Sequence, residues 1–183
     1  MNRSRGTPDR RVEVVAYDPT WPVRAAEECH LLVSRLGDVL KVVEHVGSTA
    51  VAGLPAKPTL DLLAGTNSIP AVLERVEELE GLGYEYRPAS FVTSPDHLFF
   101  RKVRNRKRTH HLHVVYMGTA EFQEYLWFRD FLVANPEAAQ RYAAFKLELA
   151  VECANDRNGY VEKKAEFVAP LMDEVRAWAA SRE

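Results

Sequence analysis

Cysteine is scarce in this sequence, which has only Cys29 and Cys153 among 183 residues. Both lie in segments with a helical pattern and far from each other, so we expect small buried side chains rather than a redox pair or zinc ligands. Long apolar runs are also missing, since none approaches the roughly 20 residues that span a bilayer. Residues 1–11 are polar, and no hydrophobic stretch follows them. The sequence therefore predicts a cytoplasmic protein without a membrane partner.

Charge of one sign is not in excess either. Lys and Arg total 24, Asp and Glu total 26, and the net charge is −2, which argues against a protein that coats nucleic acid. The length and an apolar content of 46% suit one domain whose core needs no metal or disulfide. We expect residues 1–11 to form a disordered lead-in and residues 12–181 to form a single domain.

Strand and helix patterns are mixed in the first two thirds of the chain, and helical patterns alone follow. The expected strands cover residues 12–17, 42–46, 59–64, 98–103 and 110–116. The expected helices cover a segment ending near residue 37 and residues 70–82, 120–133, 136–153 and 160–180. This order predicts an α+β domain, with a mixed or antiparallel sheet, helices on one side and a C-terminal helical layer.

The most informative segment joins a Gly-Ser turn at the end of a strand to a carboxylate on the next strand. Gly47 and Ser48 open a turn whose free N–H groups and hydroxyl can hold a phosphate. Asp61 can hold a divalent cation against that phosphate. Asp61 is therefore the candidate catalytic residue, and Mg²⁺ or Mn²⁺ is the candidate cofactor.

Several neighbouring residues have both a functional and a structural interpretation. His111 and His113 share one face of their strand, and a His/His/Asp metal site forms if that face meets Asp61; otherwise both histidines are packed and hydrogen-bonded. His45 contacts a phosphate, orients the turn, or is a strand histidine satisfied by the backbone. Lys57 is either a phosphate ligand or a solvated loop residue.

The string from His45 through Asp61 resembles the GrpB family, a group of small proteins with a nucleotidyltransferase-like fold. Further matching segments are Tyr17-Asp18-Pro19-Thr20-Trp21, His110-His111-Leu112-His113-Val114-Val115 and Phe128-Arg129-Asp130-Phe131-Leu132. The resemblance covers residues 12–175 and implies that fold, with a nucleotide or another phosphorylated small molecule as partner. It also implies substrate-binding roles for Arg129, Lys146, Tyr160 and Lys164. Related domains follow dephospho-CoA kinase in some bacteria, which points to nucleotide or coenzyme metabolism.

The sequence departs from active nucleotidyltransferases at Leu63. Those enzymes usually carry two carboxylates two positions apart on this strand, where both clamp a metal. Here only Asp61 is present, so nucleotidyl transfer by two metals lacks a ligand. From the sequence alone, Leu63→Asp is expected to strengthen cation binding.

Three functions remain open at this stage. The chain is an enzyme acting on a phosphorylated small molecule, or a non-catalytic module of the same fold that binds a ligand or a protein; metal-dependent turnover separates the two. The third function is RNA binding through residues 101–108, which hold six basic side chains without interleaved aromatics. For the first two we expect Ser48, Lys57 and Lys164 to converge in one cleft, although an ion pair is the alternative for Lys164.

Overall fold

The computed structural model describes residues 12–91 and 93–182, so the predicted lead-in 1–11 lies outside the described residues. The elements in chain order are α1 Trp21–Leu36, β1 Val42–Val46, the 3₁₀ helix η1 Ser48–Ala50, β2 Leu60–Thr66, α2 Ile69–Leu73, α3 Val76–Gly81, β3 Tyr84–Tyr86, the 3₁₀ helix η2 Pro88–Ser90, β4 Leu98–Arg104, β5 Lys107–Tyr116, α4 Ala120–Ala134, α5 Pro136–Glu152 and α6 Arg157–Ala180. No helix among these residues is both long and apolar enough to cross a membrane.

The strands form one five-stranded mixed sheet in the order β1-β2-β5-β4-β3. The β2–β5 pairing is parallel, whereas β1–β2, β4–β5 and β3–β4 are antiparallel. In the parallel pair, Asp61 lies opposite His111 and Leu63 lies opposite His113. Side chains alternate along a strand, so these four residues share one face of the sheet, which we call the site face.

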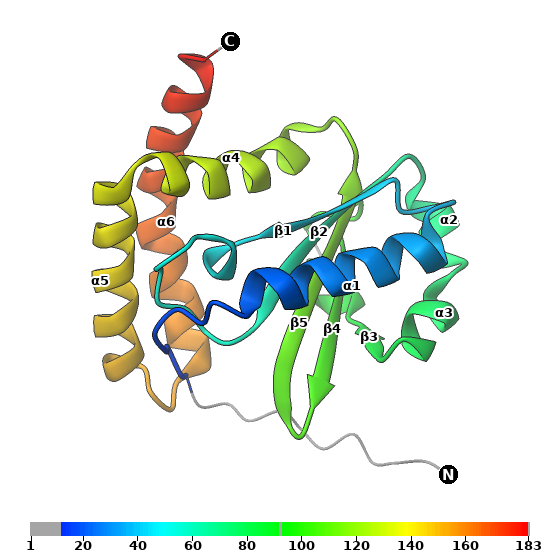
Figure 1. Ribbon diagram of the computed structural model, residues 1–183, viewed down its shortest axis with the longest axis horizontal. Helices are drawn as coiled ribbons and strands as arrows, with labels where there is room; N and C mark the ends of the chain where they lie inside the picture. Colours follow the sequence, from blue (N-terminus) through cyan, green and yellow to red (C-terminus); the bar gives the residue numbers. More distant parts are fainter. Residues whose placement is uncertain (1–11, 92, 183) are drawn as a thin grey trace.

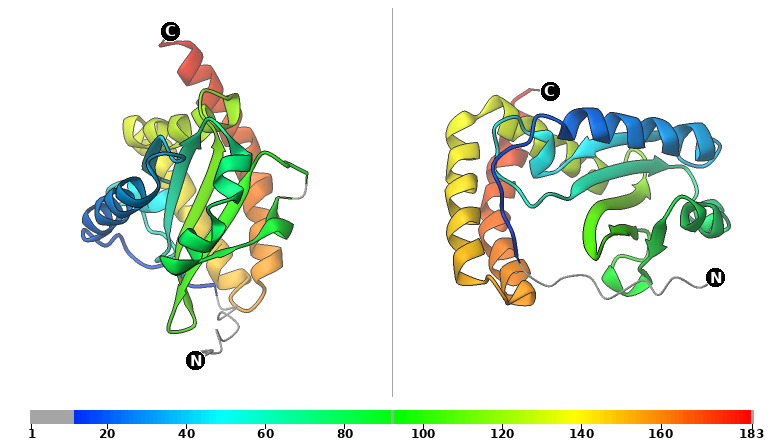
Figure 2. Two further views of the ribbon diagram at one scale, coloured as in Figure 1. Left: turned by 90° about the vertical axis from the view of Figure 1, so that its right-hand side faces the viewer. Right: turned by 60° about the horizontal axis from the view of Figure 1, so that its bottom comes forward.

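The opposite face of the sheet carries the main core. Helices α1, α2 and α3 pack there against the buried Leu60, Leu62, Phe100, Leu112 and Val114. Figure 1 shows α1 lying across the strands, and the left view of Figure 2 shows α1 and α6 on opposite sides of the sheet. The burial of this apolar face of the sheet against the apolar faces of the helices is the main stabilising term.

The C-terminal helices α4, α5 and α6 form a second layer beside the sheet (Figure 1). Their core consists of Val51, Leu54, Phe131, Leu132, Ala138, Tyr142, Leu171 and Val175. Side-chain caps fix two of the helix starts: Thr119 Oγ1 accepts from Phe122 N, and Asp156 Oδ1 accepts from Gly159 N. This layer brings residues 146–164 beside a turn that lies about 100 positions earlier. The predicted arrangement, helices on one side and a C-terminal helical layer, is confirmed.

Two predicted elements differ in the structure. The expected strand 12–17 makes a single bridge, in which Val15 and Ala56 exchange backbone hydrogen bonds; Pro55 and Pro58 stand close by, and proline cannot donate to a strand ladder. The expected helix 70–82 divides into α2 and α3 at Arg75, where φ is −105° and ψ is 13°. The Arg75 guanidinium pairs there with Asp38 and Glu78.

Candidate functional site

The Gly-Ser turn packs directly against the candidate catalytic carboxylate. Val46, the last residue of β1, lies opposite Asp61, and Gly47 follows it with φ 72° and ψ −168°. A Cβ on Gly47 would lie 2.7 Å from Asp61 Oδ2. Only glycine adopts this backbone region readily, so both the conformation and the close approach require Gly47.

Lys146 ties the turn to helix α5. Its side chain is buried, with 2% exposure, and its Nζ donates to Ser48 Oγ at 3.0 Å and to the Pro55 carbonyl at 2.6 Å. The Nζ atom also lies 4.4 Å from the ring centroid of Tyr142. Burial, followed by the charge of Lys164, lowers the pKa of Lys146 to about 7.

Lys57 and Lys164 also lie near the Asp61 carboxylate. With Lys146 they form what we call the lysine cluster. Lys57 Nζ lies 3.4 Å from the ring centroid of the buried Tyr160, and burial, followed by Arg157 and Lys164, lowers its pKa to about 7. Tyr142 and then Asp61 raise the pKa of Lys164, against the effect of burial. The charge of Asp61 acts on all three ammonium groups. The cluster thus gathers three amino groups around one carboxylate, and Lys57 and Lys146 are about half protonated near pH 7.

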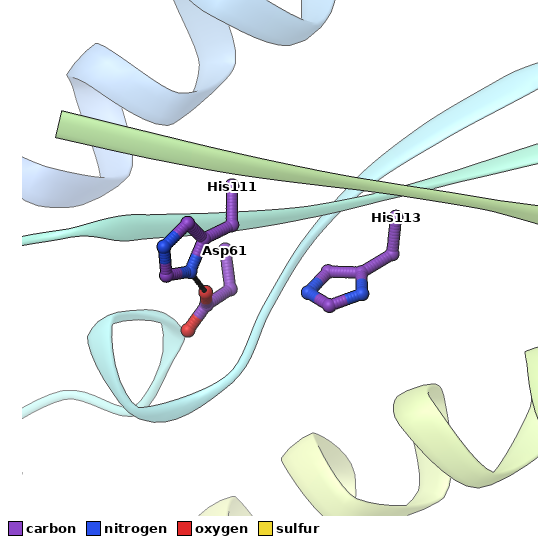
Figure 3. Close-up of side chains that lie close together, drawn as sticks. All are labelled: Asp61, His111 and His113. Atoms are coloured by element: carbon purple, nitrogen blue, oxygen red, sulfur yellow. Dashed lines mark hydrogen bonds and ion pairs between the residues drawn. The ribbon is translucent and has the colours of Figure 1, made fainter. Parts of the chain in front are cut away.

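Two histidines of β5 lie beside Asp61, as Figure 3 shows. His111 Nδ1 lies 2.9 Å from Asp61 Oδ1, and one ligand atom each from Asp61, His111 and His113 lies within 4.8 Å of the others. Burial disfavours the Asp61 anion, but the hydrogen bond from His111 and the positive charge of Lys164 favour it, and the pKa of Asp61 is lowered. If His111 Nδ1–H donates to the carboxylate, His111 Nε2 holds a lone pair that is buried and without a partner among the described residues.

A hydrogen-bonded chain that the sequence did not reveal holds His113. His97 Nδ1 lies 2.6 Å from Glu121 Oε1, and His97 Nε2 lies 2.9 Å from His113 Nδ1. Burial lowers the pKa of His97 and lowers that of His113 to about 3, so both rings are neutral. With the His97 proton on Nδ1 toward Glu121, His113 donates from Nδ1, which leaves a lone pair on His113 Nε2. Tyr125 Oη lies 3.1 Å from His113 Nδ1.

Only part of this hydrogen-bonded chain of side chains had a signal in the sequence. Glu121 and Tyr125 stand four residues apart in α4, a spacing that places two side chains on one helix face. His97 belongs to no motif, and it comes before β4 after a turn in which its N–H bonds to the Ser94 carbonyl. The ring of His97 stacks on Phe91 at a centroid distance of 3.7 Å.

His45 and Arg129 stand apart from the lysine cluster. His45 lies opposite Leu62, so its side chain belongs to the face away from Asp61, and its Nε2 lies 2.8 Å from Thr49 Oγ1. His45 is therefore hydrogen-bonded to the turn residue Thr49 and lies on the other face of the sheet from Asp61. Arg129 Nη1 donates to Glu44 Oε2 and to the His45 carbonyl, and its Nε donates to Asp130. These contacts fasten α4 to β1.

Leu63 is on the site face but is closed off from solvent. It has no exposed surface and packs with Val46, Val115 and Phe122 of α4. The position where a second carboxylate usually stands is therefore part of an apolar cluster under α4. The structure explains the departure seen in the sequence, because an ionised side chain would be desolvated there.

The low pKa of Lys146 predicts that stability rises with pH. The folded pKa is about 7 and the unfolded value is about 10.4, so the unfolded chain binds more protons between these values and stability increases from pH 7 to 10. In Lys146→Met this contribution is absent. The difference in unfolding free energy between wild type and variant should therefore grow by roughly 3 kcal/mol from pH 7 to 10. Urea unfolding measures it, with the exposed Lys163→Met as control; parallel pH curves would refute the assignment.

Comparison with known proteins places this fold and site in a family. The α+β class that the sequence predicted, with a mixed sheet and a C-terminal helical layer, is confirmed. The family model described as "GrpB protein" matches residues 11–174, and the chain belongs to the GrpB family. A crystal structure of the conserved protein GrpB from Enterococcus faecalis superposes with a TM-score of 0.82 at 32% identity, covering 91% of this chain and 99% of that one.

The curated relatives differ in length from this chain. A UPF0157 protein of Pseudomonas aeruginosa is 39% identical over 177 residues, which are 95% of this chain and 71% of that protein. The UPF0157 protein YqkA of Bacillus subtilis is 31% identical over 175 residues, 96% of this chain and 50% of that protein. A dephospho-CoA kinase of Mycolicibacterium paratuberculosis is 30% identical over 93% of this chain and 47% of its own length. The chain thus spans about half of two of these proteins.

Proposed function

We propose that this chain binds a nucleotide or another phosphorylated small molecule at the lysine cluster. The observation that carries the proposal is the charge imbalance of the cluster. Among the described residues, the ion pairs of lysine involve Lys102, Lys107 and Lys163 and none of the cluster. A phosphate would supply the missing negative charge, and each charge-assisted hydrogen bond to an ammonium is stronger than a neutral one.

The surroundings of the cluster favour phosphate over a carboxylate ligand. Lys146 and Ser48 already share a hydrogen bond, so a hydroxyl and ammonium groups are available together at the turn. A phosphate carries up to two charges and several acceptor oxygens, which three lysines and a hydroxyl can satisfy at once. A bound phosphate would raise the lowered pKa values of Lys57 and Lys146, so binding near pH 7 would be coupled to proton uptake.

The first test removes Lys164, which interacts electrostatically with Asp61 and with the two other lysines. We expect Lys164→Ala to weaken AMP binding about ten-fold or more, because a charge-assisted contact contributes roughly 1.5–3 kcal/mol, with little loss of stability. Isothermal calorimetry at fixed ionic strength measures the affinity, and thermal unfolding measures stability. Lys163→Ala, one residue earlier on α6 and exposed with Glu152 as partner, is the matched control. Unchanged AMP binding together with marked destabilisation would make Lys164 a structural residue.

Side chains beside the lysine cluster offer a divalent cation a place next to the phosphate. Asp61, His111 and His113 provide one carboxylate and two imidazoles, a donor set that suits Zn²⁺ or another transition metal better than Mg²⁺, which prefers oxygen ligands. The ligand atoms of tetrahedral zinc lie about 3.4 Å apart, so the three side chains would draw together from their present spacing. A bound cation would neutralise phosphate charge at Asp61.

The metal proposal predicts selective zinc binding. Calorimetry of the wild-type chain should give tighter binding of Zn²⁺ than of Mg²⁺, and His113→Ala should weaken Zn²⁺ binding by at least about ten-fold, since ligand loss removes one of three protein donors. His110→Ala is the control, because His110 lies on the opposite face of the same strand beside Glu28. Equal zinc affinity in the two variants would exclude His113 as a ligand.

Binding without catalysis is the form of this function that the residues favour. Two-metal nucleotidyl transfer needs a second carboxylate where Leu63 is buried, so assays for metal-dependent turnover distinguish an enzyme from a binding module. RNA binding through the hairpin of β4 and β5 has less support, because Arg101, Lys102 and Lys107 are already paired with Glu85, Glu28 and Glu13.

A further inference from the structure

A bulge between β4 and β5 brings Arg108 onto the site face, where Arg101 also lies. Arg101 lies opposite His111, which places its side chain on that face. A register shift between Lys102 and Val103 sets Val103 opposite Arg108. In an unbroken ladder Arg108 would oppose Arg104 and point to the other face; the bulge turns Arg108 onto the site face.

The carboxylate on this part of the face is already shared. Glu85 accepts from Arg101 at 2.8 and 3.1 Å and from Arg87 at 2.8 Å. Arg108 and Arg157 form no ion pair within residues 12–91 and 93–182, and Arg108 Nε is buried without a hydrogen-bond partner there. We call Arg108 and Arg157 the arginine pair.

Burial and neighbouring positive charges act on both guanidinium groups of the arginine pair. Burial lowers the pKa of Arg108 to about 10, and the charges of Arg157 and Arg101 add to the effect. The pKa of Arg157 is lowered too, first by burial and then by Arg101. Both guanidinium groups remain charged at neutral pH, so their desolvation and mutual repulsion oppose folding unless an anion binds between them.

The arginine pair adjoins the lysine cluster through the loop before β2. Thr59 Oγ1 donates to the Arg108 carbonyl at 3.1 Å. Two residues earlier, Lys57 lies on the ring of Tyr160, which is one helical turn beyond Arg157 in α6. Lys57 feels the charges of both arginines as well as those of Lys164 and Asp61. Lys57 is therefore the member of the lysine cluster that links it to the arginine pair.

We propose that the arginine pair forms a second anion subsite, so that the site face takes a small molecule with two phosphate groups. The first phosphate lies at the lysine cluster, and in this respect the inference rests on the proposed function. The second phosphate lies between Arg108 and Arg157, where planar guanidinium groups donate two hydrogen bonds each to its oxygens. A ligand with one phosphate fills only one subsite and binds more weakly.

The test compares ligands with one and two phosphates by calorimetry at constant ionic strength. The probes are AMP, ADP and adenosine 3′,5′-bisphosphate, and the proteins are wild type, Arg108→Gln, Arg157→Gln and the control Arg106→Gln, which removes an exposed charge at the tip of the same hairpin. We expect wild type to bind ADP or the bisphosphate at least about ten-fold more tightly than AMP. Both arginine-pair variants should lose that preference, with AMP affinity changed less than about three-fold, and Arg106→Gln should keep it. A preference for ADP indicates adjacent phosphates, and a preference for the bisphosphate indicates separated ones.

The other outcomes distinguish this inference from the proposed function. If AMP and both two-phosphate probes bind wild type equally well, or if Arg106→Gln loses as much as the arginine-pair variants, the second subsite is wrong and the proposed function stands. If no probe binds, both fail. A single-stranded RNA oligonucleotide is a fourth probe, and if the arginine-pair variants lose affinity for it alone, the pair binds RNA and the second subsite is wrong. Thermal unfolding checks each variant, and because Arg157 is at the start of α6, Arg157→Gln tests the subsite even if Arg108→Gln does not fold.

Discussion

Leu63→Asp is expected to destabilise the chain by about 4 kcal/mol at pH 7 without creating a metal site. Leu63 has no exposed surface and packs with Val46, Val115 and Phe122. The substitution removes a buried apolar side chain, which costs roughly 2–5 kcal/mol by truncation alone, and adds a carboxylate without a partner. Because burial raises the pKa of such a carboxyl, the loss should be smaller at pH 4 than at pH 7.

Urea unfolding at both pH values measures this effect, and Leu63→Asn separates the charge from the change of shape. The asparagine variant should show no comparable pH dependence. In the sequence alone, alternation along β2 places Leu63 beside Asp61, and tighter cation binding follows from that. The cover of α4 changes the expectation: calorimetry with Mn²⁺ should show no gain in affinity. A stable Leu63→Asp protein that binds Mn²⁺ more tightly would mean that Phe122 moves aside easily.

Local pattern was sufficient to predict most of the fold. The four longer strands and α1, α4, α5 and α6 stand where the apolar periodicities place them. The failures arose where short segments depend on neighbours far away in sequence. Strand β3, Tyr84–Tyr86, has three residues and exists because it pairs with β4, and the break at Arg75 coincides with ion pairs to Asp38 and Glu78.

The candidate site was predictable only as far as its motifs extend. The turn at Gly47 and the strand alternation of β5 indicated that Asp61, His111 and His113 could meet, and the parallel register joins them. The contact of Lys146 with Ser48 spans 98 positions, and no spacing rule connects two such residues. The placement of Arg108 depends on one bulge. The hydrogen bond to His97 determines which nitrogen of His113 carries the proton. Both are tertiary effects, absent from any local pattern.

Gly47 combines the two strongest local constraints of the site, and Gly47→Ala is expected to cost about 3 kcal/mol. The backbone region at φ 72° and ψ −168° disfavours any Cβ by roughly 1–3 kcal/mol. The new Cβ would also lie 2.7 Å from Asp61 Oδ2 and 3.1 Å from Asp61 Cβ, so the carboxylate must move. We therefore expect both lower stability and Zn²⁺ binding weakened by at least about ten-fold.

A double-mutant cycle separates the two causes. In an Asp61→Ala background the clash with Oδ2 is gone while the backbone strain stays, so Gly47→Ala should cost about 1 kcal/mol less than in wild type. Gly53→Ala is the control, since Gly53 has φ 78° but no atom within 4 Å of its added Cβ, and about 1–2 kcal/mol of strain is expected there with zinc binding unchanged. If Gly47→Ala costs the same in both backgrounds, the carboxylate does not press against the turn. In that case the turn holds its shape independently of Asp61.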